Sequence, residues 1–131
     1  MTAVPDILCL GEPLVEYLRQ PDGTDLAHGI GGDTSNAGIA AARQGASVGY
    51  ITALGADAGA EVILRTWAEE GIDTALVRRD PQAPTGAYTI VPDPEARHFI
   101  YDRAGSAASR MASIIERGLA SPRPAMSKAV P

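Results

Sequence analysis

The sequence predicts an α/β fold built around a parallel sheet, and three observations support this prediction. Short apolar runs at residues 7–10 and 48–51 are typical of buried strands. Two stretches with the character of helices, residues 33–44 and 60–68, follow these runs in turn. A further β-type run at residues 75–78 completes the order strand, helix, strand, helix, strand, which favours parallel pairing because helices make the crossover connections.

The first strand and the first helix are recognised by their composition and their ends. Residues 7–10 read Ile-Leu-Cys-Leu and close at Gly11, as a short buried strand does. Residues 33–44 are rich in alanine, whose small side chain lets a helix pack closely on a sheet, and Gly45 is placed to end this helix.

The second helix is predicted from one apolar stripe. Apolar side chains recur at helical spacing at Ala60, Ile63, Leu64, Trp67 and Ala68. On the outside, Glu61, Arg65 and Glu69 are spaced for ion pairs with one another, and Gly71 is placed to stop the helix.

The other β-type segments predict antiparallel units. Residues 14–18 and 26–30 are strand candidates on either side of the turn-forming sequence Gln-Pro-Asp-Gly. Residues 85–91 and 97–103 are interpreted as a hairpin, because the two prolines in the connection between them suit a turn and would break a helix.

The second strand of this hairpin places polar groups on one face. Period-two alternation puts Arg97, Phe99, Tyr101 and Arg103 together, and Tyr88 on the partner strand joins them if it points to the same face. Two phenol hydroxyls and a guanidinium would then surround one polar ligand. The alternative is an ordinary half-solvated hairpin with Arg103 in water.

Composition and charge narrow the class of partner. The net charge of -5 argues against nucleic acid or an anionic membrane, both of which require clustered lysine and arginine. The single cysteine, Cys9, is interpreted as a small buried thiol, and without a disulfide framework a reducing compartment is expected. No apolar run approaches membrane-spanning length and no signal peptide is recognised, so a cytoplasmic location is expected.

The most informative stretch is residues 29–36, Gly-Ile-Gly-Gly-Asp-Thr-Ser-Asn. Adjacent glycines that lead into a helix start offer backbone N–H groups and short polar side chains to one small polar molecule. The candidate binding residues in this stretch are Gly32, Asp33, Thr34, Ser35 and Asn36. Two roles remain open for Asp33, which either contacts a ligand hydroxyl or caps the helix.

A dinucleotide-binding site is a weaker interpretation of the same glycines. Thr34 stands where the third glycine of that fingerprint belongs, and no fingerprint turn directly follows the first core strand.

Several motifs occur in a specific order along the chain. Residues 31–36 read Gly-Gly-Asp-Thr-Ser-Asn, residues 54–59 read Leu-Gly-Ala-Asp-Ala-Gly, and residues 70–74 read Glu-Gly-Ile-Asp-Thr. In this order they resemble the N-terminal half of the ribokinase-like, or PfkB, carbohydrate kinases. The resemblance runs from about Asp6 to Ser109.

Within that family, three further segments look most like those of 2-keto-3-deoxygluconate kinases. They are Gly-Glu-Pro-Leu-Val-Glu-Tyr at residues 11–17, Thr-Gly-Ala-Tyr at 85–88, and Tyr-Asp-Arg-Ala-Gly-Ser-Ala at 101–107. These enzymes phosphorylate a sugar acid on its terminal hydroxyl and use ATP and Mg²⁺.

The resemblance implies a fold and roles for the candidate residues. The fold would be an incomplete ribokinase-like three-layer αβα core with a small β lid, formed by about residues 12–30 and 85–103. Residues 32–36 would hold the sugar, and Tyr88 and Tyr101 match substrate-facing tyrosines.

Arg103 matches the arginine that holds the carboxylate of the acid, a role that suits a planar, two-pronged donor. Glu12 and Glu16 are expected to be solvated structural residues, with a minor role for Glu16 at the sugar.

The resemblance fades before the catalytic segment of the family. In family members the catalytic aspartate lies in a Gly-Ala-Gly-Asp type segment near the C-terminus, and this sequence contains no such segment. Residues 1–109 are therefore expected to be the N-terminal part of a kinase domain, and residues 110–131 a divergent tail of disorder-prone composition. A truncated or frame-shifted product, or half of a split enzyme, would explain this pattern.

The favoured function is the substrate-binding part of an ATP-dependent sugar-acid kinase that is inactive as an isolated chain. No catalytic or metal-binding residue is assigned, and ATP and Mg²⁺ are expected for complete relatives but not for this chain alone. The alternative is a non-catalytic sugar-acid binding or regulatory module. Expected partners are a sugar acid and either a second copy through the lid strands or a missing C-terminal half, with no nucleic acid and no membrane.

Overall fold

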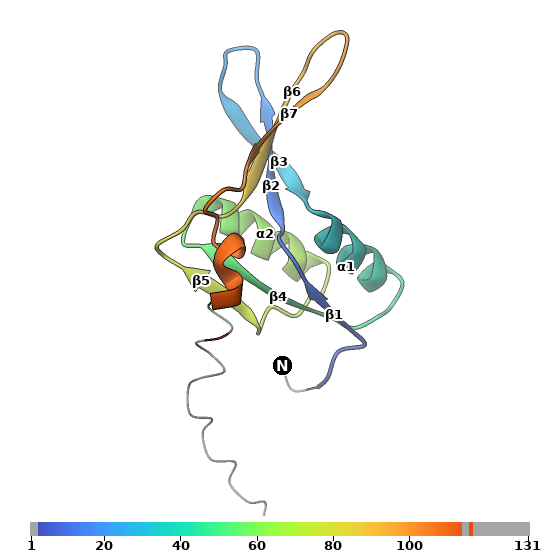
Figure 1. The fold of residues 1–131 in the computed structure, drawn as a ribbon. Coiled ribbons are helices and arrows are strands. Elements are labelled where there is room, and N and C mark those ends of the chain that lie inside the picture. Colours follow the sequence, from blue (N-terminus) through green and yellow to red (C-terminus); the bar gives the residue numbers. More distant parts are fainter. Residues whose placement is uncertain (1–2, 114–115, 117–131) are drawn as a thin grey trace, which may run out of the picture.

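The computed structural model describes residues 3–113 and residue 116, and it contains two sheets (Figure 1). In chain order the elements are β1 (Ile7–Leu10), β2 (Leu14–Arg19), β3 (Asp25–Gly31), α1 (Asp33–Arg43), β4 (Val48–Gly55), α2 (Ala58–Glu69), β5 (Val77–Asp80), β6 (Ala87–Val91), β7 (His98–Asp102) and the 3-10 turn η1 (Ala108–Arg110). The core sheet has the order β1-β4-β5, and the lid sheet has the order β3-β2-β6-β7.

The predicted α/β class is confirmed by the pairing of the strands. All pairs in the core sheet are parallel, with β1 and β5 on either side of β4. The lid sheet is mixed, because β2 pairs antiparallel with β3 and parallel with β6, while β6 and β7 form the predicted antiparallel hairpin. Since β2 follows β1 after a short connection, the lid sheet is a direct continuation of the core (Figure 1).

Several element boundaries differ from the sequence-based expectation, among them those of β4 and β5. β4 continues to Gly55 rather than ending at residue 51, because its second half pairs with β5. β5 begins at Val77 rather than residue 75, because the Ala75 N–H donates to Asp73 Oδ1 at 2.8 Å and holds this segment in a turn.

The principal core lies between the core sheet and the two helices. Alternate side chains of β4, among them Val48, Tyr50 and Leu54, point toward these helices and are buried. The predicted stripe on α2 provides the other side, where Ile63 and Trp67 are fully buried. The Trp67 ring stacks on that of Tyr50 with 4.2 Å between ring centroids, so these aromatic rings form the centre of the domain.

The opposite face of the core sheet is covered less completely. Ala53 packs there against Ala107 and Met111, which lie in the segment that contains η1. On the same sheet, Leu8 and Leu10 of β1 remain 49% and 58% exposed.

The expected tail begins in this region. Residues 111–113 are helical and follow η1 directly, whereas residues 114–115 and 117–131 of the expected tail lie outside the described residues. No helix in the described part of the chain is long and apolar enough to span a lipid bilayer.

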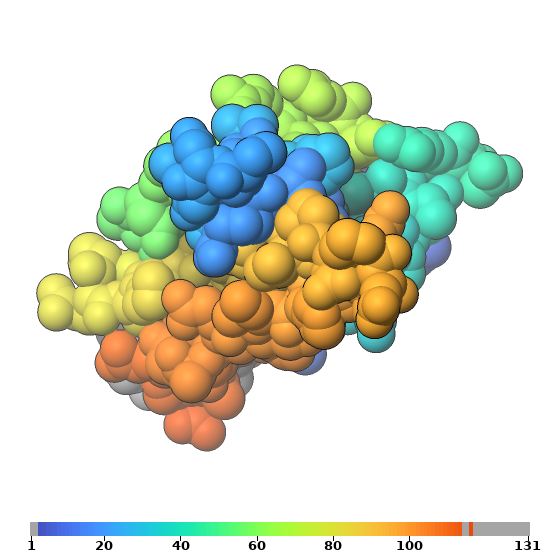
Figure 2. All heavy atoms as spheres, turned by 90° about the horizontal axis from the view of Figure 1, so that it is seen from above, coloured from blue at the N-terminus to red at the C-terminus, as the bar shows by residue number. Residues whose placement is uncertain are grey.

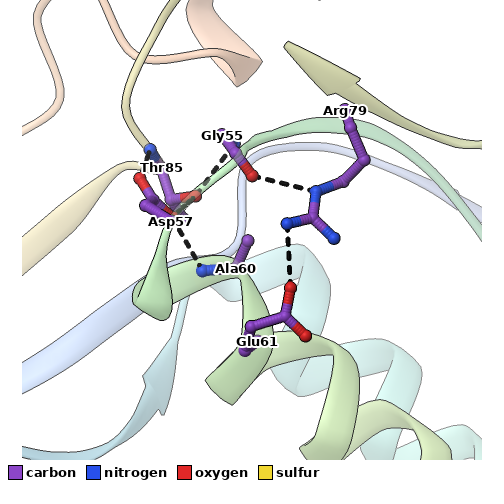
Figure 3. Close-up of polar contacts among 6 residues, drawn as sticks. All are labelled: Gly55, Asp57, Ala60, Glu61, Arg79 and Thr85. Atoms are coloured by element: carbon purple, nitrogen blue, oxygen red, sulfur yellow. Dashed lines mark hydrogen bonds and ion pairs between the residues drawn. The ribbon is translucent and has the colours of Figure 1, made fainter. Parts of the chain in front are cut away.

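A hydrogen-bond network joins the core to the start of lid strand β6 (Figure 3). Asp57 caps α2 by accepting the Ala60 N–H at 2.9 Å, and it accepts the N–H and hydroxyl of Thr85 at 2.8 and 2.7 Å. Burial would raise the pKa of Asp57, but the bonds from Thr85 and Ala60 outweigh it and the pKa of this carboxyl is lowered. The network fixes the point at which β6 leaves the core.

Arg79 of β5 extends the same network (Figure 3). Its Nε donates to the Gly55 carbonyl at 2.9 Å, and its terminal nitrogen pairs with Glu61 at 2.9 Å. Glu61 had been expected to pair with Arg65 along its own helix. The structure pairs it with a strand residue, Arg79 of β5, instead.

Candidate functional site

A pocket of about 440 Å³ opens where the lid sheet meets the first turn of α1. The residues that line this lid pocket are Glu12, Leu14, Gly31, Gly32, Asp33, Thr34, Asn36, Tyr88, Phe99, Tyr101 and Arg103. The structure therefore brings together seven of the eight predicted site residues, from segments far apart in the sequence. The two hairpins that form the lid sheet, blue and orange in Figure 2, lie side by side above the core.

Two glycines are required by the shape of the pocket. Gly32 has φ of 103°, a left-handed conformation that other residues rarely adopt, and a Cβ there would meet the Glu12 carbonyl oxygen at 2.6 Å. A Cβ on Gly31 would meet the Tyr88 hydroxyl at 2.6 Å. The adjacent glycines thus let the start of α1 approach both the connection from β1 to β2 and the Tyr88 ring.

The first turn of α1 directs three polar side chains to the pocket: Asp33, Thr34 and Asn36. Gly32 occupies the N-cap position and no side chain caps the helix, so Asp33 does not take the capping role that the sequence had left open. Its carboxylate instead lines the pocket. Because these residues start a helix, their side chains surround a point to which the helix dipole brings partial positive charge.

Ser35 lies elsewhere, although it belongs to the same sequence motif. It is fully buried, and its hydroxyl accepts a hydrogen bond from Trp67 Nε1 at 3.0 Å. Helical periodicity explains the difference, because the residues on either side of Ser35 point toward the lid while Ser35 points toward α2. The structure gives Ser35 a packing contact and no place on the pocket wall.

The aromatic wall of the pocket comes from the hairpin of β6 and β7. Tyr88 and Tyr101 are directly opposite each other across the two strands, with ring centroids 5.8 Å apart, and Phe99 lies beside them. Of the four residues predicted to share one face, Phe99, Tyr101 and Arg103 line this pocket together with Tyr88, whereas the prediction was wrong for Arg97. Arg97 precedes β7 and lines a different pocket near Asp93.

Tyr88 is held in place by a carboxylate. Its hydroxyl donates to Glu16 Oε1 at 3.0 Å. Burial, together with this hydrogen bond and the negative charge of Glu16, raises the pKa of Tyr88 to about 12. The phenol therefore stays neutral at physiological pH, and its ring forms a fixed surface of the pocket.

Glu12 is a pocket residue that the sequence analysis missed. Arg103 Nε donates to Glu12 Oε1 at 2.6 Å, and the hydroxyl of Ser106 donates to Glu12 Oε2. Only 11% of the Glu12 side chain is exposed, so the expectation of a solvated structural role was wrong for this residue. No local pattern signals the pair, because 91 positions separate its two members.

The lid pocket has the chemistry expected of a site for a small polyhydroxylated molecule. It combines an amide, a hydroxyl, carboxylates and phenols, which together donate and accept hydrogen bonds, with aromatic surface beside them. Arg103 is the single cationic side chain among its lining residues in the described part of the chain.

Comparison with known proteins identifies the family to which this chain is similar. Residues 5–119 match the model of the family described as pfkB family carbohydrate kinase. A curated relative, the 2-dehydro-3-deoxygluconokinase of Dickeya dadantii, is 33% identical over 109 residues, which are 80% of this chain and 34% of that protein. The Escherichia coli K12 protein of the same name is 36% identical over 107 residues, which are 78% of this chain and 34% of that protein.

A solved structure gives the same result at the level of the fold. The crystal structure of a fructokinase with bound ATP from Xylella fastidiosa superposes with a TM-score of 0.70 and 31% identity, and the match covers 78% of this chain and 31% of that chain. The chain thus spans about one third of the length of the curated relatives that it matches. On the family match, the identity to the curated relatives and the fold, the chain belongs to the pfkB family of carbohydrate kinases.

Proposed function

We propose that this chain is the N-terminal, substrate-binding part of an ATP-dependent sugar-acid kinase of the 2-keto-3-deoxygluconate kinase type. The observation that carries the proposal is the convergence of Tyr88, Tyr101 and Arg103 from the lid on the glycine-rich start of α1 around one pocket. The name shared by the two curated relatives, 2-dehydro-3-deoxygluconokinase, supports the same substrate class.

Arg103 is the reason for proposing an acid rather than a neutral sugar. A guanidinium binds a carboxylate through two parallel hydrogen bonds, and these are stronger than bonds between neutral groups. Nε of Arg103 is taken by Glu12, while its two terminal nitrogens form no hydrogen bond within the described residues. They are therefore available to the carboxylate of a ligand.

The start of α1 would recognise the hydroxyl groups of the sugar. Asn36 offers both a donor and an acceptor, and Asp33 offers acceptors close to the N-terminus of the helix. Tyr101, which is 60% exposed, would cover the carbon skeleton with its ring.

The proposal assigns no ATP or Mg²⁺ contact to the described residues. No group of three or more His, Cys, Asp or Glu side chains within residues 3–113 and 116 is arranged to hold a metal ion. Glu12, one of the two carboxylates in the lid pocket, is already engaged by Arg103 and Ser106. We therefore assign nucleotide and metal binding to the remainder of a complete kinase domain, and we derive no catalytic step from this chain.

The test of the proposal is the affinity for an acid compared with a neutral sugar. Arg103→Ala should weaken binding of 2-keto-3-deoxygluconate by about 1.5 to 3 kcal/mol, because it removes charge-assisted hydrogen bonds. Binding of D-fructose should change much less. Titration calorimetry measures both affinities, and Arg97→Ala, which removes an arginine outside the lid pocket, is the matched control. Equal losses for the acid and for fructose would remove Arg103 from the carboxylate role.

The isolated chain should not transfer phosphate from ATP to a sugar acid, even with Mg²⁺. Phosphoryl transfer depends on positioning both reactants and on stabilising the moving charge, so contacts to one substrate provide little acceleration. An assay coupled to ADP release on purified chain measures this. Glu16→Gln serves as a control, because Glu16 is the carboxylate nearest to Tyr88. Sugar-dependent turnover that disappears in this variant would place a catalytic base in the lid and contradict the proposal.

A further inference from the structure

We infer that Glu12 is a positioning residue that holds Arg103 for the carboxylate of the ligand and so determines selectivity for acidic over neutral sugars. The inference rests on the proposed function. Its basis is the ion pair between Glu12, which lies in the connection from β1 to β2, and Arg103, which directly follows β7. The pair lies on the wall of the lid pocket.

The geometry of the ion pair leaves the binding edge of the guanidinium open. Glu12 Oε1 accepts from Nε of Arg103 at 2.6 Å and forms no further hydrogen bond to this side chain. A guanidinium has several edges, and the edge formed by the two terminal nitrogens matches a carboxylate as well as the edge that includes Nε. Glu12 can therefore fix the plane of the group without occupying the place of the ligand.

Glu12 is itself fixed by its surroundings. The hydroxyl of Ser106, a residue only 1% exposed, donates to Oε2, and this hydroxyl also accepts the Ser109 N–H at 3.2 Å. Gly86 leaves room for the same oxygen, because a Cβ at that position would lie 2.7 Å from it. The Glu12 carboxylate is largely shielded from water and both of its oxygens accept hydrogen bonds, so it is a rigid anchor for Arg103, whose side chain is 53% exposed.

The ordering of Arg103 by Glu12 should affect selectivity because only an acidic ligand depends on the guanidinium. Without Glu12 the Arg103 side chain, which is 53% exposed, would gain freedom to extend into water. A ligand carboxylate would then have to order it again on binding. A neutral sugar needs hydroxyl partners at the start of α1 and makes little use of the guanidinium, so its affinity should depend weakly on Glu12.

Two substitutions of Glu12 distinguish its role in positioning Arg103 from the effect of its negative charge. Glu12→Ala removes the acceptor, and in the full 131-residue chain it should weaken binding of 2-keto-3-deoxygluconate about tenfold with less than about a twofold change for D-fructose. Glu12→Gln keeps an acceptor for Arg103 and can donate to Ser106. It should bind the acid at least as tightly as the original chain, because a nearby negative charge is also removed.

A measurement without ligand tests the same arrangement independently. The side-chain N–H of Arg103 at Nε, assigned by NMR through its loss in Arg103→Lys, should exchange slowly with water in the original chain and in Glu12→Gln. It should exchange rapidly in Glu12→Ala, while far-ultraviolet circular dichroism confirms that this variant is folded.

The outcomes distinguish the inference from the function on which it rests. If Glu12→Ala weakened the binding of the acid and of fructose equally, Glu12 would have only a structural role and the inference would be overturned. Unchanged affinity for the acid would also overturn it, because Glu12 would then play no part in binding. Failure of the original chain to bind either sugar would overturn the proposed function and the selectivity role together. In that case the Arg103 resonance would still decide whether Glu12 holds the guanidinium.

Discussion

The core sheet and the lid sheet of this protein use their residues in opposite ways. In β4, at the centre of the core sheet, seven of the eight residues are buried, whereas all five residues of β7 in the lid sheet are exposed. The core holds its shape through apolar contacts around Trp67. The lid holds its shape through strand pairing and a few ion pairs, such as that of Arg103 with Glu12.

The comparison shows how a binding site is divided between rigid and accessible parts. The start of α1 is fixed by the core, so Gly32 and Asn36 have a defined position before any ligand arrives. Tyr101 lies in β7 and Arg103 directly follows it, and both are largely exposed, which leaves the Tyr101 hydroxyl and the terminal nitrogens of Arg103 accessible to a ligand. We expect substitutions in the core to change stability and substitutions in the lid to change binding.

The largest loss of stability should result from a substitution at the centre of the core. Trp67→Ala should lower the free energy of unfolding by about 3 to 5 kcal/mol, because it leaves a cavity beneath Tyr50 and removes the partner of Ser35. Ile100→Ala is the matched lid variant, and because Ile100 is 52% exposed it should change stability by less than about 1 kcal/mol. Urea unfolding followed by circular dichroism measures both. Similar losses of unfolding free energy in the two variants would contradict the distinction between core and lid.

An intermediate loss of stability is expected from a substitution at the hydrogen-bond network that joins the core to β6. Asp57→Ala should cost about 2 to 3 kcal/mol, because it removes the cap of α2 together with both bonds to Thr85. The folded pKa of Asp57 is depressed, so its contribution to stability is complete above the ordinary aspartate pKa of 3.8 and is lost as pH falls through the lower folded value.

The pH dependence of stability tests the contribution of the Asp57 charge. Acid unfolding curves of the original chain and of Asp57→Asn should converge at low pH and separate above about pH 4. Curves that stay parallel throughout would mean that the charge of Asp57 does not contribute to the junction.

A small effect on the free energy of unfolding is expected when the lid loses one hydrogen bond. Tyr88→Phe removes one hydrogen bond to Glu16 and should cost about 1 kcal/mol. The folded pKa of Tyr88 is raised to about 12, so this contribution is fully present below its ordinary value of 10.0 and is lost as pH rises through about 12. The difference between the tyrosinate absorbance titrations of the original chain and the variant should show one group ionising near pH 12. Ionisation near pH 10 would mean that the lid pocket is open to water around Tyr88.

The difference between the two regions also explains how far the sequence could predict the structure. The strands and helices of the core could be predicted because apolar periodicity and terminal glycines are local signals, and β1 lies at the predicted residues. The face shared by Phe99, Tyr101 and Arg103 followed from the alternation along a single strand.

The contacts that no local signal encodes were missed. Glu12 meets Arg103 across 91 positions, and Glu61 meets Arg79 across 18, so each partner depends on how the strands are arranged in space. Ser35 was grouped with its neighbours because they form one motif, although the helix turns its hydroxyl toward Trp67. Sequence patterns identified the residues of the site better than they identified which side chains bond to one another.

The pairing of β2 has a consequence for the order in which the chain folds. β2 and β3 are adjacent in sequence and can pair after closing a short turn, but β2 meets β6 through residues such as Glu16 and Tyr88, which are 72 positions apart. The entropy of closing so long a loop is unfavourable until α1, β4, α2 and β5 have condensed and shortened the effective distance. The β6–β7 hairpin should therefore join β2 late. The wall that carries Tyr88, Tyr101 and Arg103 would then be assembled after the helix that faces it, so newly made chains acquire a core before they acquire a complete pocket.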